Sequence, residues 1–305
     1  MLEFLSDAYL SAAATLVIAG PAEWAVHKHI LHSRSRSVGF IKEASVAHND
    51  NHHGAFMSPQ HYYRDITNED VTVHFSKGDV ALIAASGAAI GAGVSSITDL
   101  STFAAAAGST AGALVAYGSY EFFHHYMHVI GERRLQIGRV FGDFVEGERS
   151  GNLRLPKPVL DDLGNTVEDR LEGRESRFGF SQIAYDILED QGLEVDIDHA
   201  IDYTEQSLRS WEESHRESLT PKQRKAYSRE KRINRSLRRS RIFGFLDNHH
   251  FVHHRSYGNN LNVVWAWFDK LIGTKKPSDA STLISNQKYW LCPNSPDEEK
   301  FVLKE

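Results

Sequence analysis

The chain has 305 residues, a net charge of −6 and a single cysteine, Cys292. One cysteine excludes an internal disulfide framework, a cysteine-based zinc ribbon and an iron–sulfur cluster. The 17 histidines are well above ordinary usage, so a metal site in this chain must be built from histidine, with help from carboxylates.

The N-terminal segment, residues 1–26, contains a moderately apolar stretch from Ala8 to Ala22 that is interrupted by Gly20-Pro21. Its start is acidic and lacks the basic region of a cleavable signal peptide. The pattern predicts a first membrane helix that is short or half-buried, and it leads directly into the first histidines.

Two longer runs carry no charge, and they extend from Val80 to Ile97 (18 residues) and from Leu100 to Tyr120 (21 residues). Each is long enough to cross a hydrocarbon core of about 30 Å. Both are rich in Ala, Gly and Ser, the small residues that let membrane helices approach closely. The short join predicts an antiparallel membrane hairpin; the alternative is a buried helical hairpin of a soluble protein.

Histidines are concentrated in four short clusters with the patterns H-x4-H, H-x3-H-H, H-x3-H and H-x2-H-H. Neutral imidazole is the commonest protein ligand for first-row transition metals. Ten histidines suffice for two ions with four or five nitrogens each, whereas a single zinc site needs three or four. The alternative for any one cluster is a solvated histidine-rich loop. The predicted ligands are His27, His32, His48, His52, His53, His124, His128, His250, His253 and His254.

Two further histidines, His61 and His74, have no companion at ligand spacing, and we interpret both as ordinary surface or supporting residues.

A long hydrophilic insertion, residues 131–245, separates the third cluster from the fourth. Residues 151–173 are typical of a loop, whereas residues 181–191 and 198–219 predict acidic amphipathic helices.

The insertion ends in a basic helix that begins at Thr220-Pro221, a helix-start signal, and is expected to reach about Phe243. It carries ten Lys or Arg residues between Lys222 and Arg241. We interpret them as a solvated face paired with the acidic helices; contact with anionic lipid headgroups is the alternative. Nucleic-acid binding is not expected, because the patch lacks interleaved aromatic residues.

Lys or Arg residues flank every histidine cluster, whereas the turn near Asp99 carries none. The positive-inside rule therefore predicts that the clusters and the insertion lie on the cytoplasmic side of the membrane.

These patterns together predict an all-α chain: an integral-membrane helical bundle with a cytoplasmic, histidine-rich di-metal cap and a soluble helical insertion. The expected organisation is membrane helices with three histidine boxes (1–130), the insertion (131–245), the fourth box with an interfacial helix (246–275) and a C-terminal tail (276–305).

Three of the clusters resemble histidine boxes of the fatty acid hydroxylase/sterol desaturase superfamily, which are integral-membrane di-iron oxygenases. The resemblance covers about residues 8–130 and 246–275. The matching motifs are Glu23-x3-His27-Lys-x2-Leu31-His32, Tyr120-Glu121-x2-His124-x-Tyr126-x-His128, and His250-x2-His253-His254 followed by Asn260, Trp267-Phe268-Asp269 and Gly273-Thr274.

The chain departs from this pattern in three respects. Its second box has three residues before the histidine pair, as in alkane- and desaturase-type relatives, where fatty acid and sterol hydroxylases usually have two. His29, His125 and His249 are extra histidines that could replace a neighbour as ligand. The insertion is much longer than the usual connection in the family.

The resemblance implies two iron ions that use O2, as co-substrate, to attack an unactivated C–H bond of a lipid or another hydrophobic substrate; zinc can replace iron during expression. The chain has no dinucleotide, haem or iron–sulfur motif, so a separate ferredoxin, cytochrome or reductase must supply electrons. Four carboxylates close to the boxes are expected to accept ring N–H groups, with helix-terminal charge as the alternative. They are Glu23, Asp50, Glu121 and Asp247.

Three alternatives to hydroxylation remain open from the sequence. A desaturase would use the same ligands. A dinuclear zinc hydrolase would use the metals to activate water. A non-catalytic membrane protein would bind or sense metal and contact a partner through the insertion.

Overall fold

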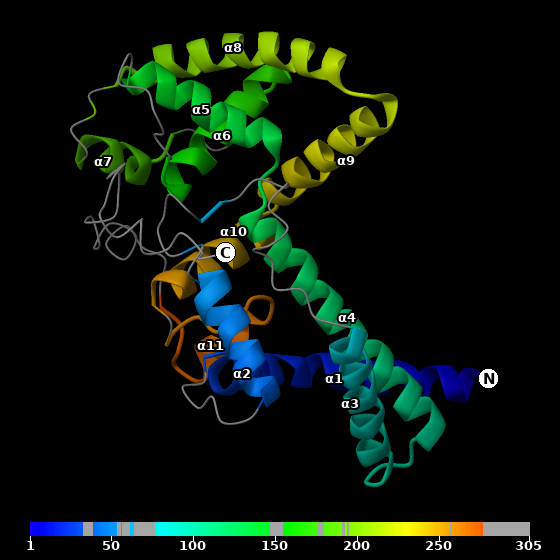
Figure 1. The fold of residues 1–305 in the computed structure, drawn as a ribbon. Helices are drawn as coiled ribbons and strands as arrows, with labels where there is room; N and C mark the ends of the chain where they lie inside the picture. Colours follow the sequence, from blue (N-terminus) through cyan, green and yellow to red (C-terminus); the bar gives the residue numbers. More distant parts are fainter. Residues whose placement is uncertain are drawn as a thin grey trace. The chain divides into compact units, whose positions relative to one another are not determined.

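The computed structural model describes residues 1–32, 39–53, 56, 62–63, 77–146, 155–175, 180–190, 193, 195–256 and 258–276. Among these residues there are eleven α-helices, two π-helical segments and no strand, which confirms the all-α prediction (Figure 1). His61, His74, Cys292 and residues 277–305 lie outside the described residues.

The chain divides into two compact units that interleave along the sequence. Unit 1 contains residues 1–52, 71–125 and 256–276, and unit 2 contains residues 53–70, 126–255 and 277–305.

Unit 1 is built on three long helices and on the short segments that carry histidines. Its elements are α1 (Leu2–Val26), η1 (His27–Leu31), α2 (Gly39–Ser45), η2 (Val46–His53), α3 (Lys77–Ser95), α4 (Thr102–His128) and α11 (Ala266–Leu271), of which η2 and α4 end just beyond the unit's boundaries.

Small residues bring α1, α3 and α4 into close contact. A Cβ atom on Gly91 of α3 would overlap the backbone of Ala105 on α4, and one on Gly108 of α4 would overlap Ala8 of α1. Ser11 adds hydrogen bonds to the carbonyl of Ala105 (2.9 Å) and the hydroxyl of Ser109 (2.7 Å). The contacts of Gly87 and Gly91 with α4 run in opposite directions along the two helices, as expected for an antiparallel hairpin.

Two helical segments, Leu2–Leu31 and Lys77–Ser95, are long and apolar enough to cross a membrane by length and composition. The second covers most of the first predicted hairpin run. Among the described residues α4 is not apolar enough to be a candidate span, because serine and glycine dilute its apolar content.

The expected interruption at Gly20-Pro21 is wrong, because α1 continues through Pro21 to Val26. Gly20 instead contacts the segment after the last histidine cluster. Its carbonyl accepts a hydrogen bond from the Asn262 side chain (2.9 Å), and the indole of Trp267 packs against the Cα of Gly20.

Unit 2 contains α5 (Glu132–Glu146), α6 (Lys157–Leu171), α7 (Gln182–Asp190), α8 (Ile197–Ser218), α9 (Pro221–Arg238) and α10 (Arg241–Arg255). The loop expected over residues 151–173 is wrong, because α6 occupies most of it. Pro156 precedes this helix, and Val159, Leu163 and Val167 bury one face at i, i+4 and i+8.

The basic helix also ends earlier than predicted. Thr220 starts α9 with a capping box, but the helix stops at Arg238, and a new helix, α10, carries the fourth histidine cluster. Three cations of this segment pair with carboxylates of α8 and of the α6 end, which agrees with the interpretation of a paired basic face. The pairs are Lys231–Glu212 (2.7 Å), Arg239–Asp169 (3.1 Å) and Arg235–Glu172.

Candidate metal centre

The first histidine pair depends on a π-turn. In an α-helix two residues five apart point about 140° away from each other. In η1 the N–H of His32 instead donates to the carbonyl of His27, an i to i+5 bond of 2.9 Å. The two rings therefore stack, with centroids 5.1 Å apart and an angle of 14° between their planes.

The second cluster of unit 1 uses the same device, because η2 is also π-helical. His48 places its Nε2 atom 3.0 Å from that of His27, and His52 places its Nε2 atom 3.1 Å from that of His124 on α4. Asn49 lies between His48 and His52 in the sequence. Its Oδ1 atom lies 2.7 Å from Nδ1 of His32, and its amide nitrogen donates to the carbonyl of Leu31. Asn49 thereby leaves Nε2 of His32 as the available ligand atom.

In unit 2, α10 presents its histidines at helical spacing. His250 and His254 are one turn apart, with Nε2 atoms 3.0 Å from each other, and His128 at the end of α4 approaches His250 at 3.1 Å. His253 lies 3.2 Å from His53, again between Nε2 atoms.

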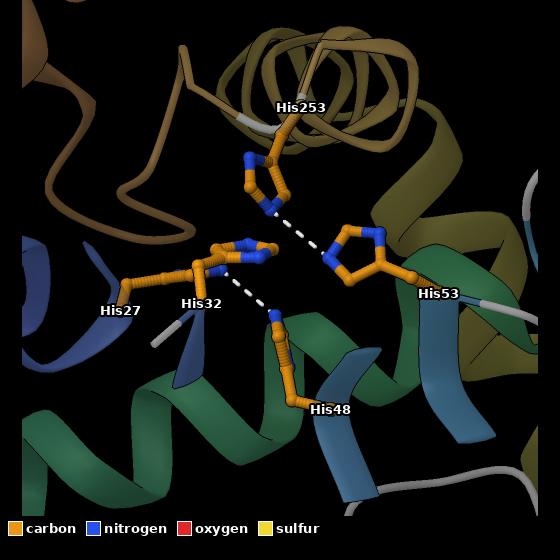
Figure 2. A group of neighbouring side chains, drawn as sticks. All are labelled: His27, His32, His48, His53 and His253. Carbon is orange, nitrogen blue, oxygen red and sulfur yellow. Dashed lines mark hydrogen bonds between the residues drawn. The ribbon is translucent and has the colours of Figure 1, made fainter. Parts of the chain in front are cut away.

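Two sets of five histidines meet the geometric requirement of a metal site, since the candidate nitrogens in each set lie within 4.8 Å of one another. Nine of the ten side chains are at most 5% exposed, and His32 is half-buried. Figure 2 shows the first set, with the His27–His48 and His53–His253 contacts as dashed lines. The sets are His27, His32, His48, His53 and His253, and His52, His124, His128, His250 and His254.

The separations between ring nitrogens fit ligands that share an ion. Two nitrogens about 2.1 Å from one metal lie about 3.0 Å apart at a right angle and about 3.4 Å apart at a tetrahedral angle. Five pairs of Nε2 atoms lie 3.0 to 3.2 Å apart. These separations are therefore compatible with neighbouring ligands of one ion.

The extra histidines of the boxes do not join either set among the described residues. His29 is exposed and lies against Trp24, with ring centroids 5.7 Å apart. His125 is half-buried, and His249 is buried against Phe245. None of them replaces a predicted ligand in the structure.

Glu23 does not accept a ring N–H, contrary to the expectation. Its carboxylate accepts three backbone N–H groups, from Val263 (2.6 Å), Val264 (3.2 Å) and Trp265 (3.3 Å). From the other side of the same loop, Asp269 accepts the N–H groups of Leu261 (3.0 Å) and Asn262 (2.8 Å). The first box therefore holds the segment that follows the last box through carboxylate–backbone bonds.

The remaining three carboxylates differ in burial. Asp50 is exposed, and Glu121 lies half-buried three residues before His124. Asp247 is 2% exposed and accepts from Tyr62, Tyr63 and Arg238 rather than from a histidine.

Sequence reasoning missed the groups that hold the rings of unit 2. The Nδ1 atom of His128 lies 2.9 Å from the main-chain carbonyl of Tyr62, which fixes the tautomer that leaves Nε2 as ligand. Phe56 stacks on His128 with ring centroids 3.9 Å apart. Main-chain carbonyls have no sequence signature, so only the fold reveals this contact.

Asn260, part of the last motif, has a structural explanation. Its φ of 52° lies in the left-handed region, and its side chain bonds Lys276 in both directions, donating to the carbonyl (3.1 Å) and accepting from the N–H (2.6 Å). Asparagine tolerates this conformation better than most residues and also closes the loop.

Comparisons of the chain with protein-family models, with curated proteins and with solved structures give no match. The structure itself thus establishes a helical protein with two buried, histidine-rich clusters that could hold two metal ions.

Proposed function

We propose that this chain is a membrane-bound di-iron oxygenase that hydroxylates an unactivated C–H bond of a lipid or another hydrophobic substrate, using O2 and external electrons. One observation carries the proposal: ten histidines form two sets of five, with ring nitrogens at the separations expected of shared ligands. Two ions held by nitrogen alone, with the ligands buried, suit redox chemistry better than structural binding.

When bound, two iron ions would supply the oxidising power that breaks the C–H bond. The histidines would hold the ions through Nε2 atoms. The carbonyl of Tyr62 orients the ring of His128 through Nδ1, and the side chain of Asn49 does the same for His32. Burial of nine of the ten rings keeps bulk water away from the site.

The membrane setting supports a hydrophobic substrate. The candidate membrane span Leu2–Leu31 includes η1 at its C-terminal end, so the first ligands lie at the end of an apolar helix. A substrate dissolved in the bilayer could therefore reach the metal centre without crossing water. We place the histidines on the cytoplasmic side and assign electron supply to a separate ferredoxin, cytochrome or reductase.

The test is metal analysis and oxygen uptake of the purified full-length chain loaded anaerobically with ferrous iron. We expect two iron ions per chain and O2 consumption that requires both a lipid extract and a reductant. Mass spectrometry of lipids from cells with and without the gene should show a gain of one oxygen. A loss of two hydrogens instead would identify a desaturase on the same site.

Matched histidine variants make the test specific. His128→Ala should lower bound iron and abolish substrate-dependent oxygen uptake, whereas His29→Ala should change neither, because His29 is exposed and outside both sets. Two zinc ions that support hydrolysis without oxygen uptake would refute the oxygenase. Two stably bound ions with neither activity would indicate a metal-binding protein.

A further inference from the structure

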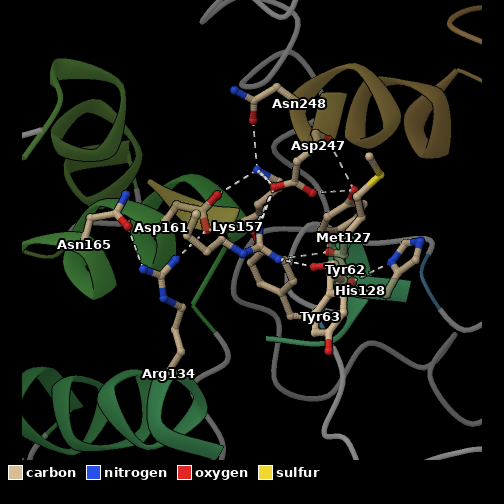
Figure 3. Close-up of polar contacts among 12 residues, drawn as sticks. Tyr62, Tyr63, Met127, His128, Arg134, Lys157, Asp161, Asn165, Asp247 and Asn248 are labelled. Atoms are coloured by element: carbon tan, nitrogen blue, oxygen red, sulfur yellow. Dashed lines mark hydrogen bonds and ion pairs between the residues drawn. The ribbon is translucent and has the colours of Figure 1, made fainter. Parts of the chain in front are cut away.

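A buried ionic network runs through the insertion and reaches the helix of the fourth histidine cluster. Three cations and three carboxylates alternate in it, so its formal charges cancel. Figure 3 shows most of its members. The ion pairs are Arg134–Glu168 (3.1 Å), Arg134–Asp161 (3.5 Å), Lys157–Asp161 (2.7 Å), Lys157–Asp247 (2.9 Å), Arg238–Asp161 (3.9 Å) and Arg238–Asp247 (2.6 Å).

The network joins four helices of unit 2. Arg134 lies on α5, Lys157 on α6, Arg238 at the end of α9 and Asp247 on α10, and their side chains are between 2% and 4% exposed. Lys157 also donates to the side chain of Asn248 (2.8 Å), the residue before His249. Lys157 and Arg238, both in the insertion, thus bind side chains in the first half of α10.

The same network reaches His128 by two routes. Arg238 donates to the carbonyl of Tyr126 (2.6 Å), two residues before His128, and so binds the end of α4 directly. Asp247 accepts from the hydroxyl of Tyr62 (3.0 Å), and the carbonyl of Tyr62 in turn holds Nδ1 of His128. Arg238 and Asp247 therefore connect the two helix segments that carry His128 and His250.

Stability alone does not account for such a network. Buried ion pairs contribute little net free energy, because desolvation offsets their attraction, and apolar residues of similar size often replace them without loss. In some proteins buried charges instead fix one geometry, because charged partners tolerate few alternative arrangements.

We propose that Lys157 and Arg238 are positioning residues of the metal centre: by holding Asp247 and the end of α4, they set the 3.1 Å separation between His128 and His250. The insertion is then part of the metal centre rather than an accessory module. This inference rests on the proposed function in that His128, His250 and His254 share one ion.

The decisive measurement is the affinity of the full-length chain for ferrous iron, titrated anaerobically against a chelator. Lys157→Met combined with Asp247→Asn removes one charge of each sign and keeps the network neutral. We expect it to weaken binding of one of the two ions by about 10- to 100-fold, the range for residues that support metal ligands. A Co2+-loaded sample should show shifted ligand-field bands, because the angle between His128 and His250 changes.

Two milder variants guard against a failure to fold. Tyr62→Phe leaves every charge and the Tyr62 carbonyl in place and removes only the bond to Asp247, so a smaller loss of affinity is expected. Lys157→Arg keeps the charge and should retain most of the affinity.

Lys231→Met is the matched control, because it breaks an ion pair of similar length (2.7 Å, to Glu212) in the same unit without touching Asp247. It should leave iron affinity unchanged. Unchanged affinity in the double variant and in Tyr62→Phe overturns the inference, as does an equal loss in Lys231→Met. An unmodified chain that binds no iron would instead overturn the proposed function.

Discussion

The two units hold the same type of ligand by different physical means. In unit 1, histidines sit on π-turns and on a helix that packs through glycine, alanine and serine, with Ser11 and Ser109 as the main buried polar contacts. In unit 2, they sit on helices fixed by buried Lys157, Arg238 and Asp247.

The difference fits the proposed setting, in which the long helices of unit 1 lie in a membrane and unit 2 lies in water. Helices in an apolar surrounding cannot use the hydrophobic effect against each other, so they associate by close van der Waals contact between small residues. A water-surrounded helical layer can bury cations and carboxylates, provided that they pair. The stability of unit 1 should therefore be sensitive to added side-chain volume, and the stability of unit 2 should be sensitive to the loss of a buried charge.

The largest effect is expected from volume added to unit 1. Gly91→Leu places a side chain where the backbone of Ala105 already lies, and backbone cannot yield as a side chain tip can. The free energy of unfolding should fall by about 3 kcal/mol or more. Thermal unfolding in detergent measures it, with Gly93→Leu as control, because nothing lies within 4 Å of a Cβ at Gly93. Equal melting temperatures would contradict close packing of α3 on α4.

The second largest effect is expected from acid, which should lower the stability of unit 2. Burial opposes ionisation of Asp161, but Lys157, Arg238 and Arg134 outweigh it and lower its pKa from 3.8 to about 2. A carboxylate with a lowered pKa stabilises the fold fully above pH 4, and this stabilisation is lost as the pH falls from about 4 to 2. The loss should amount to about 2 kcal/mol.

Melting temperatures of the unmodified chain and of Asp161→Asn, compared at pH 5 and pH 2.5, provide the check. The variant should lose less stability than the unmodified chain over this interval. Parallel losses in both would show that Asp161 does not carry the acid sensitivity.

A smaller effect is expected at Gly131, the turn between α4 and α5. Its φ of +80° costs a side chain about 1 to 2 kcal/mol, and a Cβ there would also displace the Glu230 carboxylate from Asn234. Gly173→Ala separates the two causes, because Gly173 has a φ of +65° in open space. Chemical denaturation should therefore show Gly131→Ala to be the less stable of the two variants; the reverse order would contradict the Glu230 contact.

The smallest effect is expected from the exposed pair Glu205–Arg209 on α8, with 2.6 Å between the charged groups. An i, i+4 ion pair on a helix surface contributes about 0.3 to 0.5 kcal/mol, which salt screens. Arg209→Ala should shift the unfolding midpoint barely beyond error, and less at high salt. If Arg209→Ala lost as much stability as Asp161→Asn does at pH 5, buried and exposed charges would contribute equally, which would contradict the comparison.

Much of the fold was predictable because its signals are local. The all-α class, the Thr220 helix start and the helices over 182–190 and 197–218 follow from periodicity and capping residues. α6 was missed because Gly164 and several acidic residues mask an apolar stripe of only three turns. The break between α9 and α10 was missed because Arg239 and Ser240 carry no strong stop signal.

The sequence by itself determined that ten histidines in four clusters are candidate ligands, since residue type and spacing are written in the chain. Only the tertiary structure decided how they divide into two sets, because each set combines histidines that are far apart in sequence. The π-turn that aligns His27 with His32, the carbonyl that orients His128 and the cations that hold Asp247 depend on backbone geometry and burial. These properties arise when separate segments pack together, so no local pattern encodes them.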